Sequence, residues 1–462
     1  MNEFRKLFWR LLILVSGQSK LFKKIVYLED WRNDKTKQLH DLICFANNQT
    51  PFYRGKFNAL VSGDVRTIEE HLVKDVPITD KQEFKRADKE LLAEFYKDRF
   101  DFFSFTLDKS LFHNLKKILF QRDYIFSLTT GGTTGSPLIS YKNKQSLLTD
   151  GLLFFRGWKM MGWKPGDKVL WFYNSYYDNS LSFINLIFPL TGIRLFFFDS
   201  LSDKVIGDFV SEINSFKPKI IVTFPSYIND AAATILKNNF KLKHYPDGID
   251  VSGETFFSHQ RANVDAVFKT KSYDGYGTIE FGMVAHECEK RSGMHVYEDI
   301  ALLESVDHES DPHSLLATRY SSHDVPIIRY KVGDRGILSR RTCECGRSGL
   351  MLESVDGRID DYVQFSDNQR MYPSSFRQIL NSCNQRYVNS IIESNLTQTN
   401  ADRLNFQVVL SDKSLQKEVE EYLSTELRKH LPAPVAFQIA FVENIRGKRK
   451  FRFIEKALPS YY

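Results

Sequence analysis

The chain has 462 residues, of which 42% are apolar, and this length and composition favour a large core divided among two or three domains. Its 63 Lys and Arg residues nearly balance 57 Asp and Glu residues, so the net charge of +6 gives no reason to expect nucleic acid as a partner. Five cysteines in a chain of this length do not make a disulfide framework and fit a reducing, cytoplasmic compartment.

The first 25 residues combine Phe, Trp and Leu with Lys and Arg. Their apolar run from Leu11 to Val15 is short, because a transmembrane helix needs roughly 20 residues, and no small-residue cleavage site follows it. Two interpretations stay open for residues 1–25. They form an amphipathic helix that packs on its own domain, or they make a peripheral contact with the inner face of a membrane.

The segments that follow predict a helical region and then a sheet. "TPFYRGKF" and "DVPITDKQEFKR" indicate turns and helix starts, because Pro51 and Pro77 interrupt regular structure and Thr79 is a candidate helix cap. From Tyr124 onwards, the β-rich runs "KVLWFY", "IRLFFF", "KIIVTF" and "KSYDGYG" alternate with helical stretches such as "INDAAATILKNNF". This alternation is typical of an α/β fold with mainly parallel strands flanked by helices.

A second unit is predicted after "VDGRIDDYV". The stretches "SSFRQILNS", "NFQVVLSD", "SLQKEVEEYLSTELRKHL" and "AFQIAFVE" are typical of a small α+β domain. We therefore expect a large N-terminal domain over residues 1–357 and a small C-terminal domain over residues 358–462. A hinge is expected between Gly357 and Asp361.

A loop rich in Gly and Thr, "TTGGTTGSP" at 129–137, follows the apolar run "YIFSL". Glycines let backbone N–H groups point inward, and Thr hydroxyls add hydrogen-bond donors, so such a loop suits phosphate groups. It lacks the lysine of a Walker loop, because Gly135 is followed by Ser136 and Pro137. Taken alone, the stretch is also compatible with an exposed turn that binds nothing.

This loop resembles the phosphate loop of the adenylate-forming superfamily, [ST]-[SG]-G-[ST]-T-G-x-P, over Thr130 to Pro137. Three further motifs follow in that superfamily's order: "YDGYGTIE", "PIIRYKVGD" and the hinge motif "GRIDD". Within the superfamily, "TPFYR", "VPITDK", "VSGETF", "ECEKRSGMHV" and "CECGR" resemble the phenylacetate–CoA ligase branch and its relatives encoded with capsular polysaccharide genes. The resemblance covers nearly the whole chain and implies the fold of these adenylating enzymes.

The resemblance implies a reaction between ATP and a small-molecule carboxylate. The carboxylate attacks the α-phosphorus, pyrophosphate leaves, and the acyl group then passes to CoA, an amine or a hydroxyl acceptor. The pyrophosphate end of ATP would be held by the phosphate loop, comprising Thr130, Gly131, Gly132, Thr133, Thr134 and Gly135, with Thr134 also acting in catalysis. The adenosine side would be held by Tyr276, which would stack on adenine, together with Gly277, Thr278, Gly253 and Glu254.

The remaining roles implied by the resemblance fall on charged residues. Glu280 would bind Mg²⁺, a cation that favours oxygen ligands, while Asp334 would accept hydrogen bonds from the ribose hydroxyls and Arg358 would assist there. Asp360 would be the hinge residue. In "NIRGKRKFRFIEK" the catalytic lysine is predicted to be Lys450, because "KFRF" matches the usual continuation, with Lys448 as the alternative.

The cysteines suggest a metal site. Cys288, His295, Cys343 and Cys345 offer three thiolates and an imidazole, a donor set that suits tetrahedral, structural zinc without an open catalytic position. His286 competes with His295 for the fourth position, and free thiols are the alternative to a metal.

The substrate is less well defined. The acyl pocket is expected to be lined from "YNSYYDNSLSFINLIF" and "TFPSYI", where Tyr176, Tyr177 and Asn179 suit either a polar carboxylate or a ring. A catalytically silent nucleotide-binding scaffold in a membrane-associated polysaccharide assembly complex remains a different class of function. A phosphoryl transferase lacks its Lys and paired Asp/Asn motifs in this chain. Neither the oligomeric state nor the carboxylate follows from the sequence.

Overall fold

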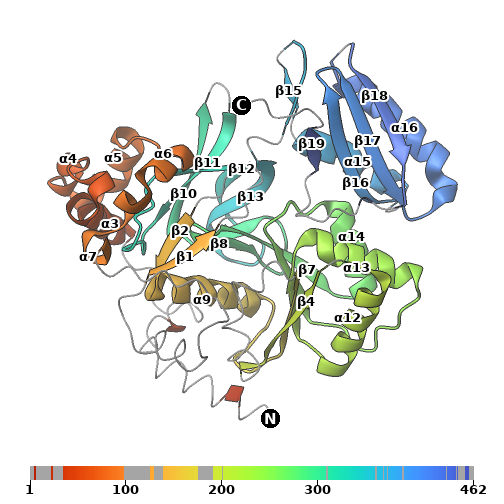
Figure 1. Ribbon diagram of the computed structural model, residues 1–462, viewed down its shortest axis with the longest axis horizontal. Coiled ribbons are helices and arrows are strands. Elements are labelled where there is room, and N and C mark those ends of the chain that lie inside the picture. Colours follow the sequence, from red (N-terminus) through yellow and green to blue (C-terminus); the bar gives the residue numbers. More distant parts are fainter. Residues whose placement is uncertain are drawn as a thin grey trace.

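The protein is described from a computed structural model that covers residues 5–6, 22–23, 35–97, 125–129, 139–174, 191–199, 201–308, 311–358, 362–367, 369–371, 373–387, 390–432, 434–443, 445 and 453–456. Within these residues the centre of the molecule is an eleven-stranded sheet, and a smaller sheet with its own helices lies beside it (Figure 1). No helix in the described part combines the length and apolar character needed to cross a bilayer.

The large sheet has a parallel half and an antiparallel half. The parallel half has the order β7-β6-β5-β3-β4, with β3 (Val169–Asn174), β4 (Ile193–Phe198), β5 (Ile220–Thr223), β6 (Gly248–Ser252) and β7 (Lys271–Thr278). From β7 the sheet continues through β8 (Gly282–Glu287), β9 (Met294–Val296), β13 (Ser348–Arg358), β12 (Tyr330–Thr342), β11 (Asp311–Arg319) and β10 (Ala301–His308), all antiparallel. The predicted parallel strands are confirmed, and the sheet as a whole is mixed.

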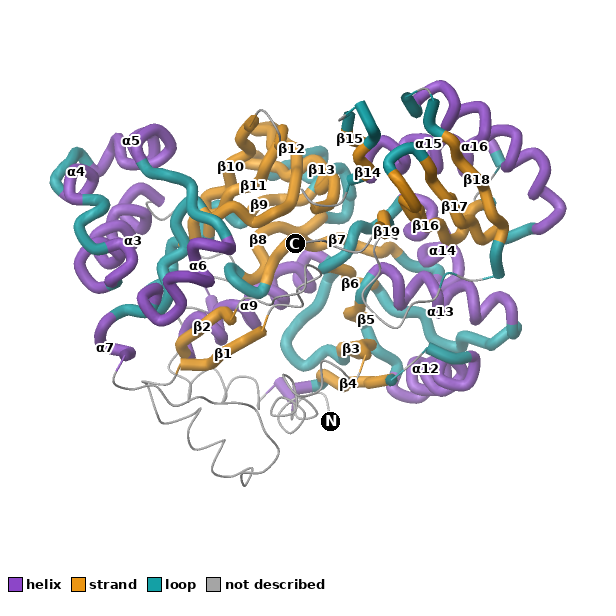
Figure 2. Tube along the Cα trace, turned by 45° about the horizontal axis from the view of Figure 1, so that its top comes forward, coloured by secondary structure: helices purple, strands orange, loops and turns teal. Residues whose placement is uncertain are grey.

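Helices cover both faces of the parallel half, as the strand pattern requires. Along β3, Leu170 and Phe172 pack toward the core under α12 (Asp203–Phe216), α13 (Pro225–Lys237) and α14 (Ser258–Phe268). Val169 and Trp171 point to the other face, where the core includes Trp158 of α9 (Lys144–Met160). This alternation is the period of two expected for a strand buried on both sides, and Figure 2 shows the strands between α9 and α12.

A helical region packs on the antiparallel half. It contains α3 (Lys35–Gln49), α4 (Asn58–Val61), α5 (Ile68–Asp75), α6 (Lys81–Ala87) and α7 (Glu94–Lys97), with the 3₁₀ turns η1 (Pro51–Tyr53), η2 (Val65–Thr67) and η3 (Asp88–Leu91). The N-cap of α6 is Asp80, which forms a capping box with Glu83, so the expected cap at Thr79 is wrong. Instead the Thr79 hydroxyl donates to the carbonyl of Ile328 at 3.0 Å, and its backbone bridges to Tyr330, which ties this region to the sheet.

The C-terminal part forms a separate four-stranded sheet of order β18-β17-β16-β19. Its strands are β16 (Ile391–Asn400), β17 (Arg403–Leu410), β18 (Ala436–Phe441) and β19 (Ile454–Lys456), preceded by the short pair β14 (Val363–Gln364) and β15 (Arg370–Met371). The helices α15 (Pro373–Arg386) and α16 (Gln416–His430) and the turn η5 (Lys413–Leu415) accompany it. Residues such as Phe376, Leu396, Phe406 and Leu423 form its own core, while the domain boundary at 357/358 stays a prediction.

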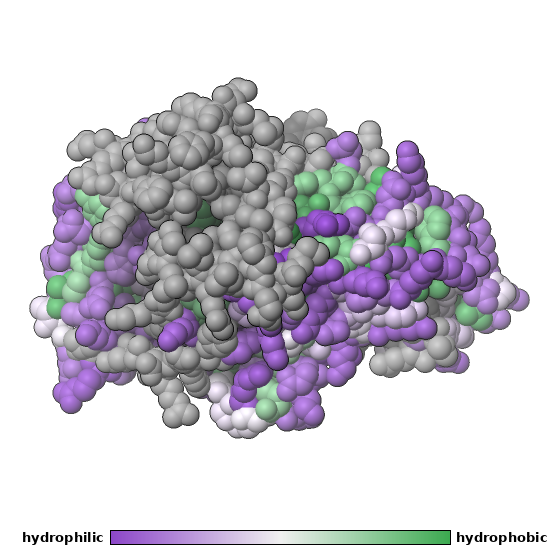
Figure 3. Space-filling view, turned by 90° about the horizontal axis from the view of Figure 1, so that it is seen from below, coloured by the Kyte–Doolittle hydropathy of each residue, from purple (hydrophilic) through white to green (hydrophobic). Residues whose placement is uncertain are grey.

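The C-terminal sheet contacts the large sheet's helices. The ring of Phe257, the residue before α14, lies 5.3 Å from the ring of Phe453, and Asn229 of α13 donates to the carbonyl of Ile392 at 3.1 Å. On the face seen in Figure 3, hydrophilic residues cover most of the described surface, with hydrophobic areas between them.

Candidate active site

Tyr276, Asp334 and Arg358 meet at neighbouring strands of the large sheet. The hydroxyl of Tyr276, on β7, donates to Oδ2 of Asp334, on β12, at 2.9 Å. Arg358 is the cross-strand partner of Asp334 on β13, and its Nη1 lies 3.8 Å from Asp334 Oδ1. Burial, with the Asp334 carboxylate adding to it, raises the pKa of Tyr276 well above its ordinary value, so the phenol stays a donor at neutral pH. The residues predicted for adenine and ribose therefore lie together.

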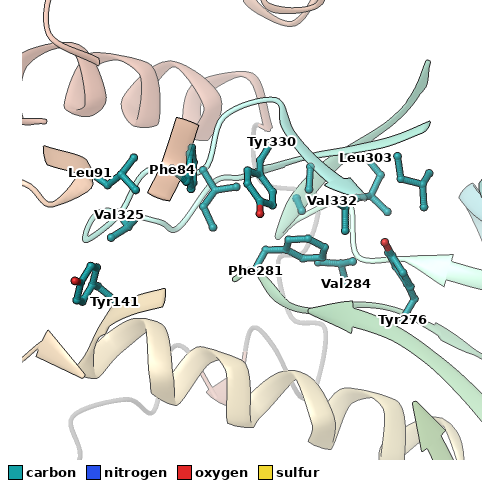
Figure 4. Packing of buried hydrophobic residues seen from close by; sticks show 14 of the residues in the cluster. Phe84, Leu91, Tyr141, Tyr276, Phe281, Val284, Leu303, Val325, Tyr330 and Val332 are labelled. Carbon is teal, nitrogen blue, oxygen red and sulfur yellow. The ribbon is translucent and has the colours of Figure 1, made fainter. Parts of the chain in front are cut away.

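The ring of Tyr276 is also held by packing in the hydrophobic core. It is 7% exposed and belongs to a core cluster that includes Phe281, Val284, Tyr330 and Val332, as Figure 4 shows. The packing fixes the ring, and the hydrogen bond fixes the carboxylate that it meets.

The turn between β7 and β8 depends on glycines. Ladder pairing shifts register between Tyr276 and Gly277, and a Cβ on Gly277 would lie 2.5 Å from the carbonyl oxygen of Gly282. Gly282 itself has φ +71°, a left-handed conformation that favours glycine. Across the site, Gly333 has φ +87° and a Cβ there would meet Arg358 Nη2 at 2.8 Å. Gly277 therefore lets β7 and β8 approach closely, and Gly333 leaves room for the guanidinium of Arg358.

Gly253 and Glu254 lie next to Tyr276. The register of β6 and β7 pairs Ser252 with Gly275, so the two residues that follow β6 leave the sheet at its carboxyl edge, where ligands bind in open α/β sheets. Gly253 adopts φ +81°, and Oε2 of Glu254 accepts a hydrogen bond from the backbone N–H of Ser226 at 3.0 Å. Ser226 is in the first turn of α13, so this carboxylate faces a helix N-terminus.

Glu280 and Thr278 present oxygen atoms at the same edge. Glu280 is half-buried and lines a recess together with Ser140 and Ser146. The hydroxyl of Thr278 is buried and makes no hydrogen bond among the described residues. A carboxylate is a donor that Mg²⁺ prefers, so Glu280 is compatible with the predicted ion.

Several predicted residues lie outside the described part of the chain: Thr130, Gly131, Gly132, Thr133, Thr134, Gly135, Tyr176, Tyr177, Asn179, Asp360, Lys448, Lys450 and most of residues 1–25. The strands on either side of the Gly/Thr loop are described. β1 (Ile125–Thr129) and β2 (Ile139–Asn143) pair antiparallel, with Thr129 opposite Ile139.

The structure brings the four predicted metal ligands together. One donor atom from each of Cys288, His295, Cys343 and Cys345 lies within 4.8 Å of all the others. Sγ of Cys288 and Sγ of Cys343 are 3.8 Å apart, and Sγ of Cys345 is 3.4 Å from Nε2 of His295. A tetrahedral zinc ion with Zn–S bonds of about 2.3 Å separates two sulfurs by about 3.8 Å, so the cluster has the spacing of such a site.

The competing ligand, His286, is engaged elsewhere. Its Nε2 lies 3.3 Å from Oδ1 of Asp250 and its Nδ1 lies 2.8 Å from the hydroxyl of Tyr297, all deep in the core. His295 has its pKa lowered by burial and then by Arg347, which keeps the imidazole neutral and able to bind a metal. His295, and not His286, is therefore positioned to be the fourth ligand of the candidate metal site.

Two charged residues that line the recess, Lys142 and Arg319, and their shared partner Asp150 have no counterpart in the sequence prediction. Asp150 of α9 accepts from Lys142 of β2, with Nζ to Oδ2 at 2.5 Å, and pairs with Arg319 of β11, with Nη1 to Oδ1 at 2.7 Å. We call Lys142, Asp150 and Arg319 the charged trio. They come from three separate elements and from no recognisable motif, so only the folded structure brings them together.

The chain is similar to known proteins in sequence and in fold. No protein-family model matches the chain. The protein CapK of Staphylococcus aureus is 22% identical over 362 residues, which cover 73% of this chain and 76% of CapK. The phenylacetate–coenzyme A ligase of Thermus thermophilus is 26% identical over 273 residues, which cover 54% of this chain and 58% of that ligase.

Among solved structures, 2-hydroxyisobutyryl-CoA ligase in its postadenylation state, in complex with R3-HIB-AMP, has a TM-score of 0.68 at 19% identity, covering 94% of this chain and 91% of that one. The same ligase in the thioesterification state, with 2-HIB-AMP and CoA, has a TM-score of 0.56 at 18% identity, covering 94% and 92%. The fold of the chain is therefore that of an adenylate-forming CoA ligase. In sequence, the chain is similar to CapK and to phenylacetate–CoA ligase.

Proposed function

We propose that this protein activates a carboxylic acid with ATP and transfers the acyl group to an acceptor. A carboxylate oxygen attacks the α-phosphorus, the bond between the α- and β-phosphates breaks, and pyrophosphate leaves. A nucleophile then attacks the acyl carbon, and AMP leaves with the bridging oxygen. The observation that carries this proposal is the Tyr276–Asp334–Arg358 cluster, because it brings together the residues expected to hold adenosine, on a fold shared with an adenylate-forming ligase.

The residues divide by the part of ATP that each would contact. Tyr276 with Gly253 and Glu254 would hold adenine, while Asp334 and Arg358 would hold the ribose. Thr278 and Glu280 face the triphosphate, where a Mg²⁺ ion bound by Glu280 would neutralise phosphate charge. The loop over Thr130–Gly135 would hold the outer phosphates.

Two roles belong to the C-terminal domain. Lys450, or Lys448 in its place, would bring a cation to the carboxylate and the α-phosphate as the adenylate forms. Asp360 would be the hinge about which this domain turns between the two half-reactions.

CoA is the acceptor that the comparisons favour, because related ligases are CoA ligases and one of those structures contains CoA. An amine or hydroxyl acceptor in cell-surface polysaccharide synthesis is favoured only by the similarity to CapK. A cytoplasmic location, with residues 1–25 touching the inner membrane face, belongs to the same proposal.

Structural zinc at Cys288, His295, Cys343 and Cys345 is the second part of the proposal. Four protein ligands leave no open position on a tetrahedral ion, so the metal would hold the β8–β9 and β12–β13 turns together and take no part in the chemistry.

The test is carboxylate-dependent exchange of labelled pyrophosphate into ATP, screened over aryl acids, short acyl acids, amino acids and uronic acids. Exchange with one class identifies the substrate, and Glu280→Ala should abolish it. Lys450→Ala should abolish it too, whereas exchange that survives in Lys450→Ala but not in Lys448→Ala moves the catalytic role to Lys448. The matched control is Lys429→Ala, an exposed lysine of α16 that pairs with Glu426 on the same helix. ATP binding without exchange, with every acid class, would support the silent scaffold instead.

A further inference from the structure

Basic residues gather where the chain enters the parallel strands of the large sheet. The loops before β3, β5, β6 and β7, and the start of β4, all lie at the amino-terminal edge of this half, whereas Tyr276, Gly253 and Glu254 lie at the carboxyl ends of their strands. We call the following set the basic edge: Arg5, Lys6, Lys164, Lys168, Arg194, Lys217, Lys219, Lys243, Lys269 and Lys271.

The loops of the basic edge lie side by side. The backbone N–H of Lys219 donates to the carbonyl of Lys168 at 2.8 Å, and the backbone N–H of Asp247 donates to the carbonyl of Lys219 at 2.7 Å. Nζ of Lys269 lies 4.9 Å from the centre of the Tyr245 ring, in the loop before β6. The basic edge is therefore one continuous surface that spans neighbouring strands.

Few acids offset this positive charge. Asp167 and Asp247 both pair with Lys219, at 2.9 Å and 3.8 Å, and Glu212 pairs with Arg194. Ten basic residues against these three acids leave an excess of seven positive charges, more than the net charge of +6 on the whole chain. Beyond Lys271 the charges balance, because Glu289 precedes Lys290 in the sequence and Arg291 pairs with Asp265.

The positive charges are close enough to repel one another. Burial lowers the pKa of Lys168, and the charges of Arg5, Arg194 and Lys217 lower it further. An anionic partner placed against this surface would relieve the repulsion and would be attracted by the summed field.

Two described pieces of residues 1–25 lie against the same part of the molecule. A Cβ on Gly166, in the loop before β3, would lie 3.3 Å from Cγ of Lys6 and 3.6 Å from Cβ of Arg5. Phe22 is 4% exposed and packs in the core cluster on the α9 face of β3. In the sequence, the apolar run of the N-terminal segment lies between these two anchored points.

We propose that the basic edge docks on an anionic lipid bilayer. Eight of its ten residues are lysines, whose point charges attract anionic headgroups without a fixed geometry, whereas nucleic-acid phosphates are better matched by the planar fork of arginine. Tyr245, which is 37% exposed, adds a side chain of the kind enriched at membrane interfaces.

This inference deepens the membrane location included in the proposed function, from residues 1–25 to a surface of the folded domain, and does not depend on the acyl-transfer chemistry. Tyr276 lies at the opposite edge of the sheet, so docking would not cover the candidate nucleotide site.

The test is co-sedimentation of the full chain with vesicles. At physiological ionic strength, vesicles of phosphatidylcholine with phosphatidylglycerol should bind the wild-type protein, vesicles of phosphatidylcholine alone should not, and high salt should release it. The triple variant Lys217→Gln, Lys243→Gln and Lys269→Gln keeps residues 1–25. It should bind about a hundredfold more weakly, because each lysine near an anionic surface contributes about fivefold.

The matched control is Lys413→Gln, Lys417→Gln and Lys429→Gln, which removes three exposed lysines from the C-terminal domain and gives the same net charge. Its binding should stay within about twofold of wild type, because these lysines lie outside the basic edge. Equal losses in the two triple variants, or no loss in the basic-edge variant, overturn the proposal. Binding of duplex RNA as tightly as the vesicles at the same salt assigns the surface to nucleic acid and also overturns it.

A second measurement covers the case in which the basic-edge variant does not fold. Hydrogen exchange of the wild-type protein should slow on the vesicles within 217–219, 241–247 and 269–271, and it should not change in α16. Protection confined to residues 1–25 rejects the basic edge. Pyrophosphate exchange measured without vesicles decides the proposed reaction separately, so the two proposals can fail independently.

Discussion

Replacing Tyr276 with Phe tests whether the Tyr276–Asp334 pair holds the ribose end of a nucleotide. The substitution removes the hydroxyl that donates to Asp334 at 2.9 Å and leaves the ring in its core cluster. A hydrogen bond to a charged acceptor contributes about 1.5–3 kcal/mol. The Asp334 side chain is 14% exposed, and Arg358 remains 3.8 Å away. In the variant, water and this cation therefore replace part of the stabilisation that the Tyr276 hydroxyl gives the carboxylate. We therefore take the lower end, about 1.5 kcal/mol, as the cost of releasing the Asp334 carboxylate. Because AMP would bind that carboxylate in its held position, we expect AMP to bind up to roughly tenfold more weakly.

The assay is calorimetric titration of AMP and of pyrophosphate into Tyr276→Phe. AMP binding should weaken, and pyrophosphate binding should stay unchanged, because pyrophosphate lacks a ribose. Since the pKa of Tyr276 is raised well above its ordinary value by burial, the hydroxyl is a donor throughout and the loss should be the same between about pH 6 and pH 9. The control is Tyr273→Phe, a buried tyrosine of the same strand in a different core cluster. Unchanged AMP affinity in a folded Tyr276→Phe variant would refute the reasoning.

Three further predictions concern the scaffold. Gly277→Ala should lower the free energy of unfolding in urea titrations by about 1–3 kcal/mol, because the added Cβ would lie 2.5 Å from a backbone oxygen. The control Gly151→Ala should be neutral or stabilising, because its Cβ would have no atom within 4 Å. Equal effects of the two substitutions would contradict this prediction. Mass spectrometry of metals should find one zinc per chain that Cys343→Ser loses together with thermal stability, and a metal-free wild-type protein of full stability would count against the site. Although burial opposes it, hydrogen bonds from Lys35, Leu350 and Arg340 lower the pKa of Glu298 below its ordinary 4.5, so its stabilisation is present above that pH and is lost as the pH falls further. In Glu298→Gln, the free energy of unfolding should decrease less as the pH is lowered than it does in the wild-type protein. An equal pH dependence in the two proteins would contradict this prediction.

The parts of the molecule that the sequence predicts correctly are those in which local pattern dictates structure. The β-rich runs become β3, β4, β5 and β7, because short runs rich in β-branched and aromatic residues are typical of buried strands. The metal ligands are similarly recognisable, since few side chains bind zinc, and the structure confirms that all four meet. Tyr276, Asp334 and Arg358 are predicted through short motifs, and their strands bring them together.

The parts that the sequence misses depend on tertiary contacts. The sequence does not distinguish the antiparallel continuation of the sheet, β8 to β13, from the parallel half, because single strands do not reveal the direction of their neighbours. Asp80 rather than Thr79 caps α6, since the Thr79 hydroxyl bonds to Ile328, far away in the sequence. The charged trio combines three elements whose residues look like ordinary surface charges in isolation.

The central claim, that a carboxylate attacks the α-phosphorus of ATP, is tested most directly with a carboxylic acid labelled with oxygen-18 in its carboxyl group. After adenylation and acyl transfer, the bridging oxygen stays with the nucleotide, so mass spectrometry should find labelled AMP together with unlabelled pyrophosphate. Formation of ADP and phosphate, or of AMP without the label in the presence of acyl product, would contradict the account.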